Sequence, residues 1–129
     1  MQKLLVFATA GLVLAACQST GGQPAASAPS SGEPIPPSRI QAEWVGKTVE
    51  ARAADGKSYL MSLKPDGTAA LGGAGNDVGN WRLTDTGYCA KWTKIRGGAE
   101  RCFTVRRTGG ETVILNPDGS VNTTVVSVK

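Results

Sequence analysis

The chain contains no histidine among its 129 residues. This absence removes Ser-His-Asp and Cys-His nucleophilic catalysis, together with the most common zinc ligand and general base. Paired carboxylates would be the remaining acid–base arrangement, but the acidic residues lie mostly in expected turns, where Asp usually accepts hydrogen bonds from its own backbone. These residues are Asp55, Asp66, Asp85 and Asp118. We therefore expect no enzymatic activity, no catalytic residues, no metal and no cofactor.

Long apolar runs are also missing. The run from Leu4 to Leu14 is too short for a transmembrane helix, which needs about 20 residues. It follows the positive residue Lys3 and precedes the small residues Ala15 and Ala16. A positive segment, a short apolar segment and small residues at the cleavage position are typical of a secretion signal peptide.

The sequence Leu14-Ala15-Ala16-Cys17 resembles the bacterial lipobox in both order and position. The resemblance implies that residues 1–16 are removed and that Cys17 carries acyl chains such as palmitate. The membrane, reached through this lipid anchor, is then the first expected partner. Gln18 stands where Asp would direct inner-membrane retention, so the resemblance favours the outer membrane of the cell envelope. The alternative is an ordinary signal peptide that is cut nearby, with Cys17 incidental.

Residues 17–38 form a segment rich in Ser, Gly, Ala and Pro, in which Ile35 is the single large apolar residue. Such a composition buries too little apolar surface to offset the entropy of ordering the chain. We therefore expect a flexible tether between the lipidated Cys17 and a folded domain over residues 39–129.

The domain has turn signals every eight to twelve residues, and short alternating runs separate them. This pattern indicates an all-β fold with tight hairpins, preceded by a short helical turn at 39–43. Nearly every expected turn contains Gly, which tolerates positive φ. Eight strands are expected, at 43–52, 58–64, 68–73, 79–84, 88–95, 100–107, 112–116 and 120–128.

Alternation within these strands predicts which side chains share the inner face. Because all the connections are short, neighbours in sequence should also be neighbours in the sheet. We therefore predict a small antiparallel up-and-down β-barrel or meander, closed or nearly closed. An open sheet and a two-layer sandwich are the alternatives. The expected inner groups are Tyr59, Met61 and Leu63; Trp81 and Leu83; Tyr88, Ala90 and Trp92; and Phe103 and Val105.

Three cysteines are present, and if Cys17 carries lipid, Cys89 and Cys102 remain as a pair. In an oxidising compartment the expected outcome is a disulfide. A redox-active or metal-binding pair is the alternative, but the chain has neither C-x-x-C spacing nor histidine.

The register that joins these cysteines makes two further predictions. If Cys89 lies opposite Cys102, an aromatic pair forms on the inner face and an ion pair forms on the outer face. The expected pairs are Tyr88 with Phe103 and Lys91 with Glu100.

Positive charge is densest between residues 91 and 107, where Glu100 is the one acid. This cluster is a candidate binding surface for an envelope protein or an anionic envelope polymer. The plainer interpretation is the solvated outer face of one hairpin. Nucleic acid is not expected as a partner, because the mature chain is only mildly basic and the outer face lacks interleaved aromatic residues. The candidate residues are Lys91, Lys94, Arg96, Arg101, Arg106 and Arg107.

Three motifs in the middle of the chain resemble small secreted or lipid-anchored domains of proteobacteria, especially alphaproteobacteria, whose function is uncharacterised. They are Asp77-x-Gly79-x-Trp81, Gly87-Tyr88-Cys89-x-x-Trp92 and Glu100-Arg101-Cys102-Phe103, accompanied by Tyr59 and Pro65-Asp66-Gly67-Thr68. The resemblance covers roughly residues 57–107 and implies a compact β-fold with bridged cysteines. A looser resemblance links the chain to lipoproteins with a small barrel that inhibit proteases.

The sequence therefore leaves three candidate functions. The first is a lipid-anchored envelope protein whose β-domain is a non-enzymatic binding or structural module. The second is a protease or lysozyme inhibitor that uses the Gly-rich loop 72–80. The third is a carrier of a small apolar ligand inside the barrel, against which the expected large interior residues argue, because they would nearly fill so small a space.

Overall fold

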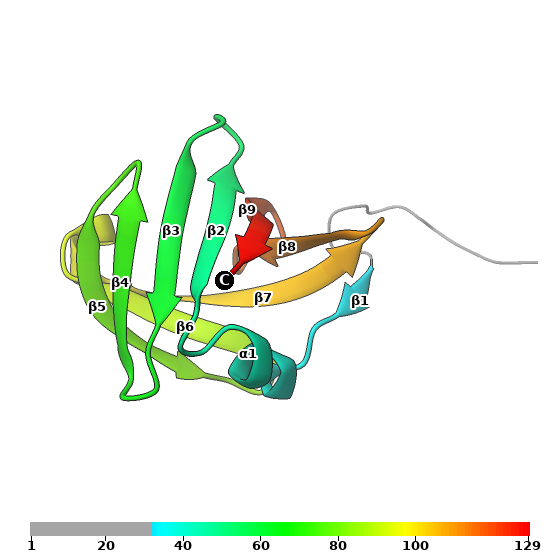
Figure 1. Cartoon of the computed structure of the whole chain (residues 1–129), viewed down its shortest axis with the longest axis horizontal. Helices are drawn as coiled ribbons and strands as arrows, with labels where there is room; N and C mark the ends of the chain where they lie inside the picture. The colour runs from blue at the N-terminus through cyan, green and yellow to red at the C-terminus, as the bar shows by residue number, and fades with distance from the viewer. Residues whose placement is uncertain (1–31) are drawn as a thin grey trace, which may run out of the picture.

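The computed structural model describes residues 32–129, so the predicted signal peptide, Cys17 and most of the predicted tether lie outside the described residues. The described chain forms an antiparallel nine-stranded sheet with one short α-helix (Figure 1). None of its helices is long and apolar enough to cross a membrane. The elements are β1 (Glu33–Pro34), α1 (Pro37–Glu43), β2 (Thr48–Ala53), β3 (Ser58–Leu63), β4 (Thr68–Gly73), β5 (Asp77–Leu83), β6 (Gly87–Trp92), η2 (Ile95–Gly98), β7 (Glu100–Thr108), β8 (Glu111–Leu115) and β9 (Val121–Val128).

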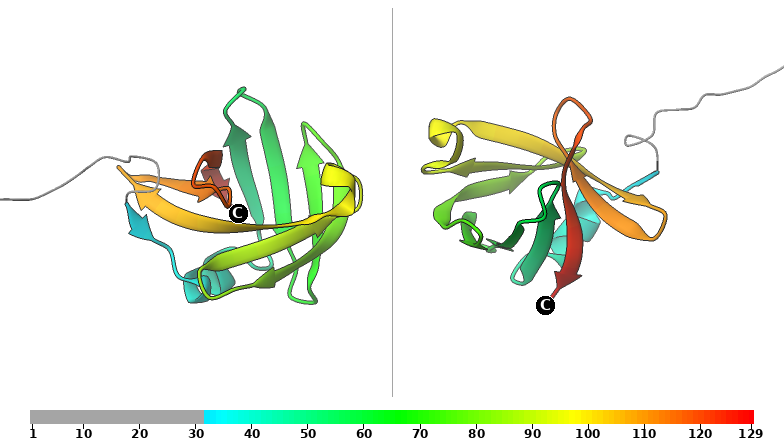
Figure 2. Two further views of the ribbon diagram at one scale, coloured as in Figure 1. Left: turned by 180° about the vertical axis from the view of Figure 1, so that it is seen from behind. Right: turned by 90° about the horizontal axis from the view of Figure 1, so that it is seen from above.

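Strands β2 to β9 form a closed up-and-down barrel. Each strand pairs with the next in the sequence, and β9 returns to pair with β2. Both views in Figure 2 show the sheet curling round on itself to meet β9. The register shifts at Glu50/Ala51 and at Ile114/Leu115, and such irregularities bend strands and help a sheet to close. The predicted eight-stranded barrel is thus confirmed.

Strand β1 lies outside this barrel and makes the folded domain begin earlier than the predicted residue 39. Glu33 and Pro34 pair with β7, and the Ile35 N–H donates to the Val105 carbonyl at 2.8 Å. Ile35 is buried among the core residues. Composition alone assigned Ile35 to the tether, whereas one apolar side chain and two edge pairings suffice to dock this segment. Pro34 is compatible with a strand here because β1 is an edge.

Helix α1 closes one end of the barrel. It begins at Pro37, whose ring suits the first helical turn because that turn needs no N–H donor. Ile40 is fully buried, and the Trp44 ring meets the Tyr88 ring edge-on with centroids 6.2 Å apart. The predicted strand at 43–52 is therefore wrong at its start, because the helix occupies residues 37–43 and β2 begins at Thr48.

The interior follows the predicted alternation. Met61, Leu63, Tyr88, Ala90, Trp92, Phe103 and Val105 are all buried and belong to the hydrophobic core, and Trp81 and Leu83 are partly buried against it. The predicted strand 88–95 ends sooner, at Trp92, and the chain then enters the 3₁₀ segment η2.

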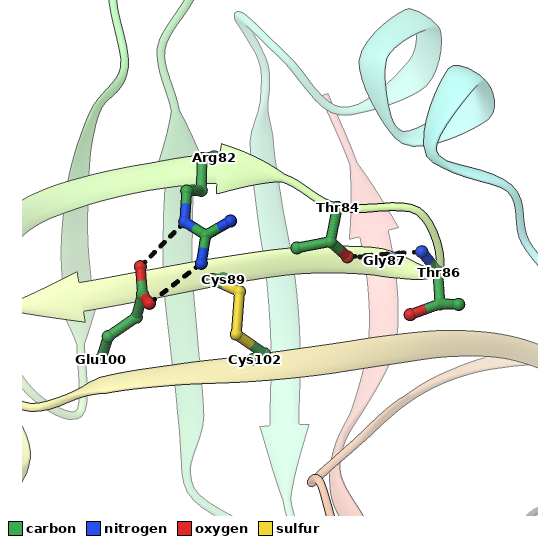
Figure 3. Close-up of a disulfide and its surroundings, with 7 residues drawn as sticks. All are labelled: Arg82, Thr84, Thr86, Gly87, Cys89, Glu100 and Cys102. Atoms are coloured by element: carbon green, nitrogen blue, oxygen red, sulfur yellow. Dashed lines mark hydrogen bonds and ion pairs between the residues drawn. A yellow bond between two sulfur atoms is a disulfide. The ribbon is translucent and has the colours of Figure 1, made fainter.

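A disulfide joins Cys89 and Cys102 directly across β6 and β7 (Figure 3). The register places Tyr88 opposite Phe103, with ring centroids 5.3 Å apart, as predicted. Lys91 also lies opposite Glu100, as predicted, and its charge contributes to lowering the Glu100 pKa, but the close ion pair of Glu100 is with Arg82. Glu100 instead accepts two hydrogen bonds, each of 3.1 Å, from the Arg82 guanidinium on β5. A planar guanidinium matches a carboxylate at two points, which an ammonium does not.

We expect the double variant Cys89→Ala/Cys102→Ala to lose about 3 kcal/mol of unfolding free energy, because the bridge closes a loop with a sequence separation of 13. Urea unfolding of the oxidised protein and of the double variant measures this loss. The Cys17→Ser variant is the matched control and should unfold at the wild-type midpoint. Equal midpoints for the wild type and the double variant would show that the bridge does not stabilise the barrel.

Candidate functional site

The end of the barrel opposite α1 holds a cavity of about 250 Å³, called the mouth cavity below. Because β2 to β9 alternate in direction, the β2–β3, β4–β5, β6–β7 and β8–β9 connections all gather at this end (Figure 1). The walls are mostly apolar, and the polar contributors are Arg96, Asn122 and Thr123. The main apolar and aromatic lining residues are Tyr59, Met61, Leu71, Tyr88, Trp92 and Phe103.

The mouth cavity exists because small side chains alternate with large ones inside the barrel. Ala51, Ala53 and Ala90 line it, each at a position that an inward-facing Leu or Val would otherwise fill. Trp81 does not line it, and its indole N–H donates to the Lys64 carbonyl at 2.7 Å. The expectation that aromatic side chains would fill the interior is therefore wrong.

Arg96 reaches the mouth cavity from an unusual backbone conformation. It lies in η2, the connection between β6 and β7, with φ of 56° and ψ of 31°. It is the one non-glycine residue with positive φ in the described chain, and Gly97 and Gly98 continue the left-handed path. This conformation costs a residue with a Cβ roughly 1–2 kcal/mol, so the fold holds Arg96 where glycine would be more favourable.

The Arg96 guanidinium lies over the Phe103 ring, with Cζ 5.8 Å from the ring centroid. Its Nε is buried and has no hydrogen-bond acceptor within residues 32–129. Burial lowers the pKa of Arg96, and the positive charge of the neighbouring Arg101 lowers it further. The guanidinium is therefore partly desolvated, next to a like charge, and incompletely hydrogen-bonded.

Tyr88, which also lines the cavity, carries a further polar group, its hydroxyl. The side chain is almost fully buried, and its hydroxyl donates to the Met61 sulfur at 3.8 Å. Burial raises the pKa of Tyr88 far above its ordinary value, so the hydroxyl stays protonated. A thioether is a weak acceptor, and the hydroxyl thus keeps the capacity for a stronger hydrogen bond.

Asp77 holds the connection that carries Arg96. Its carboxylate, at the start of β5, accepts hydrogen bonds from the backbone N–H groups of Lys94 and Ile95, both at 2.9 Å, and of Val78 at 2.8 Å. Burial alone would raise the pKa of Asp77, but these three hydrogen bonds outweigh it and lower the pKa below the ordinary value. Our sequence prediction did not name Asp77 as a site residue, although the motif Asp77-x-Gly79-x-Trp81 contained it.

Three of the four Asp residues in the expected turns accept hydrogen bonds within their own turns. Asp66 accepts from the N–H and the hydroxyl of Thr68, and Asp118 accepts in the same way from Ser120. Asp55 accepts from the Lys57 N–H. These hydrogen bonds occupy the carboxylates in local turn structure.

Of the six predicted basic residues, the structure brings Arg96 and Arg101 close together at the mouth. Lys91 and Lys94 are exposed. Two others lie further along β7, where Arg106 donates to the Gly32 carbonyl and Arg107 donates to the Thr112 hydroxyl. The six residues therefore extend from β6 through the β6–β7 connection to the end of β7, and their role in binding a partner stays a prediction.

The predicted loop 72–80 is a tight hairpin. Gly72 and Gly73 belong to β4, and residues 77–80 belong to β5, which leaves a three-residue connection at 74–76. An inhibitor that inserts this segment into an enzyme cleft would present a short rigid turn, and that function stays a prediction.

One group of potential metal ligands occurs near the disulfide. The ligand atoms of Cys89, Glu100 and Cys102 lie within 4.8 Å of one another. Both sulfurs belong to the disulfide, however, and the Glu100 carboxylate binds Arg82. The group therefore offers no thiolate to a metal.

Comparisons of the chain with protein-family models, with curated proteins and with solved structures gave no match. The resemblances of the lipobox and of the three central motifs therefore stay predictions from the sequence.

We expect Asp77→Asn to lower the Tm at neutral pH, because the amide replaces a carboxylate that three backbone N–H groups bind. A carboxyl whose pKa is lowered by folding stabilises the protein above its unfolded-state pKa, and this stabilisation is lost as the pH falls through the lowered value. The Tm difference from the wild type should therefore be constant above about pH 5 and shrink below the ordinary value of 3.8.

Thermal unfolding between pH 2.5 and 7 measures this effect. Asp85→Asn is the matched control, because it makes the same change on an exposed turn, and its Tm should equal that of the wild type at neutral pH. An Asp77→Asn protein that is as stable as the wild type at pH 7 would contradict the anchoring role of Asp77.

Proposed function

We propose that this protein is a non-enzymatic lipoprotein of the cell envelope whose β-barrel binds a small, largely apolar ligand in the mouth cavity. The observation that carries the proposal is the cavity itself, about 250 Å³ in volume and lined by apolar and aromatic side chains. Well-packed interiors of small domains hold few voids larger than a water molecule. A void of this size lowers the stability of a small barrel, even one that a disulfide cross-links. Ligand binding would explain why the sequence retains the void.

The dimensions of the cavity limit the ligand. An apolar cavity of about 150 Å³ engineered in another protein stays dry and binds benzene. The mouth cavity is larger than that but smaller than sites for drug-sized molecules, which begin at about 300 Å³. It therefore suits one aromatic ring with a short substituent, or an alkyl chain of about eight carbons. Aromatic walls at Trp92 and Phe103 supply a flat apolar contact surface for either shape.

The position of the barrel in the cell is the second part of the proposal. Lipid on Cys17, joined to β1 by the residues between them, would hold the domain near the outer membrane. Two or three acyl chains anchor a protein far more firmly than one. Support for this part comes from the lipobox sequence Leu14-Ala15-Ala16-Cys17. A barrel held there would meet small amphipathic molecules that cross or leave the membrane.

Filling the mouth cavity tests the binding function. We expect Ala51→Leu to abolish binding of 1-octanol and to leave the unfolding free energy unchanged or raise it by about 1 kcal/mol, because the added carbons enter empty space. Ala69→Leu is the matched control: Ala69 is equally buried but does not line the cavity. This variant should keep 1-octanol binding and lose about 1–3 kcal/mol by overpacking.

Isothermal titration calorimetry and urea unfolding, both on the full chain carrying Cys17→Ser, give the two readouts. The proposed binding function would be refuted by protein that binds none of three probes with the same eight-carbon tail, namely 1-octanol, octanoate and octylamine. Equal affinity of the wild type and the Ala51→Leu variant would likewise refute it, because the alcohol would then bind elsewhere.

Mass spectrometry of the protein from the envelope fraction tests the anchor. We expect a mature chain that begins at Cys17 and carries acyl groups on that residue, whereas Cys17→Ser should appear in the soluble periplasmic fraction without them. A cleavage site other than the Ala16–Cys17 bond, or an unmodified Cys17, would contradict the lipoprotein assignment.

A further inference from the structure

We propose that the mouth cavity selects amphipathic anions, with an oxyanion head group held by Arg96 and a short apolar tail inside the barrel. This inference rests on the proposed binding function and deepens it by naming the chemical class of the ligand. It starts from three features of Arg96 that each cost free energy and that together favour an anionic ligand.

The first feature is the unpaired donor. Arg96 Nε is buried without an acceptor among the described residues, although its guanidinium lies against Phe103. A cation–π contact uses the face of the guanidinium, whereas its N–H groups point outward in the plane. The contact with Phe103 thus leaves the Nε donor unsatisfied. A carboxylate or sulfate oxygen is the acceptor that a guanidinium binds most strongly, often at two points.

The second feature is the left-handed backbone at Arg96. Residues in sparsely populated backbone conformations cluster at ligand sites, where contacts with the surrounding structure hold them in place. Here the surrounding structure is identifiable, because Asp77 binds the N–H groups of Lys94 and Ile95 immediately before Arg96. The positive φ then directs the chain so that the Arg96 side chain contributes to the cavity wall.

The third feature is the local charge. Arg101 lies near Arg96, and like charges at short range repel each other. None of the described residues that line the cavity is Asp or Glu, so no carboxylate of the lining compensates Arg96. Asp118 accepts hydrogen bonds from Ser120, which lower its pKa, and the positive charge of Arg101 lowers that pKa slightly further. The mouth therefore presents net positive charge above an apolar pocket.

Tyr88 completes the site. Tyr88 lines the same cavity as Arg96, and its hydroxyl donates to the Met61 sulfur at 3.8 Å. The phenol is a second hydrogen-bond donor on the cavity wall, and Met61, Trp92 and Phe103 supply apolar surface for the tail.

Calorimetric titration with three probes of equal tail length tests the inference on the full chain carrying Cys17→Ser: octanoate, 1-octanol and octylamine. We expect octanoate to bind at least tenfold more tightly than 1-octanol, because a hydrogen bond to a charged group contributes enough free energy for such a ratio. Octylamine should bind no more tightly than 1-octanol, since its ammonium would meet Arg96.

Two variants of Arg96 then test whether this residue causes the preference for octanoate over 1-octanol. Arg96→Met keeps an apolar side chain over the mouth and should reduce octanoate affinity to that of 1-octanol, with 1-octanol affinity unchanged. Arg107→Met is the matched control, because it removes the same charge from an exposed residue that does not line the cavity. Its probe preferences should equal those of the wild type. Arg96→Gly, which suits the positive φ, serves as the second variant, and it should also lose the octanoate preference while its Tm stays equal to or above that of the wild type.

The outcomes separate the inference from the function on which it rests. Binding of 1-octanol as tightly as octanoate would overturn the anion preference and leave the binding function intact. An octanoate preference that survives both Arg96 variants would also overturn it, because the head group would then be held elsewhere. Failure of all three probes to bind would refute the binding function itself. Octyl sulfate, titrated in parallel, distinguishes a carboxylate-specific site from one that accepts oxyanions in general.

Discussion

The pairing of β9 with β2 is the constraint on which the rest of the structure depends. Without it the eight strands would form an open curved sheet, and the inward side chains would face solvent. Closure buries the residues of β3, β6 and β7 against one another. It also removes two exposed sheet edges, which otherwise invite pairing with other chains. Helix α1 then needs to cover only one end, because the sheet itself encloses the sides.

Closure also requires strands to approach closely at particular points, and two glycines permit this. Gly79 on β5 lies against the Lys91 carbonyl, and Gly87 on β6 lies against the Phe103 carbonyl. A Cβ at either position would clash with those backbone atoms. Neither glycine has positive φ, so their role is to give space and not to form a turn. This accounts in physical terms for two of the positions in the central motifs.

Much of the barrel could be predicted from the sequence because its elements follow local rules. Alternation identified the inner face, and the Pro-Asp-Gly turns place Gly67 and Gly119 at positive φ as such turns require. The cysteine register was predictable because one alignment of β6 on β7 satisfied the thiols and the aromatic pair together. Lys91 was assigned to Glu100 because the competing Arg82 lies on β5, outside the hairpin that the register described.

What escaped prediction depends on contacts between distant segments. The start of the domain at Glu33 is fixed by pairing with β7, more than seventy residues away, in a stretch whose composition resembles a linker. The left-handed backbone at Arg96 could not be inferred, because arginine gives no signal for positive φ. Asp77, at the start of β5, binds the N–H groups of Lys94 and Ile95, the two residues that precede Arg96 in the β6–β7 connection. The mouth cavity was missed for a related reason: counting large residues does not show where Ala51 and Ala90 leave space between them.

The composition of the interior supports the proposed binding function over selection for stability alone. A stability-optimised barrel of this size would place large aliphatic residues at Ala51 and Ala90 and glycine at position 96. The chain instead has alanine at positions 51 and 90 and arginine with positive φ at position 96, and all three residues line the mouth cavity. An apolar cavity alone needs a cover, but any apolar side chain would provide one. The guanidinium with an unpaired Nε is the feature that favours the proposed site for charged amphiphiles over a packing defect.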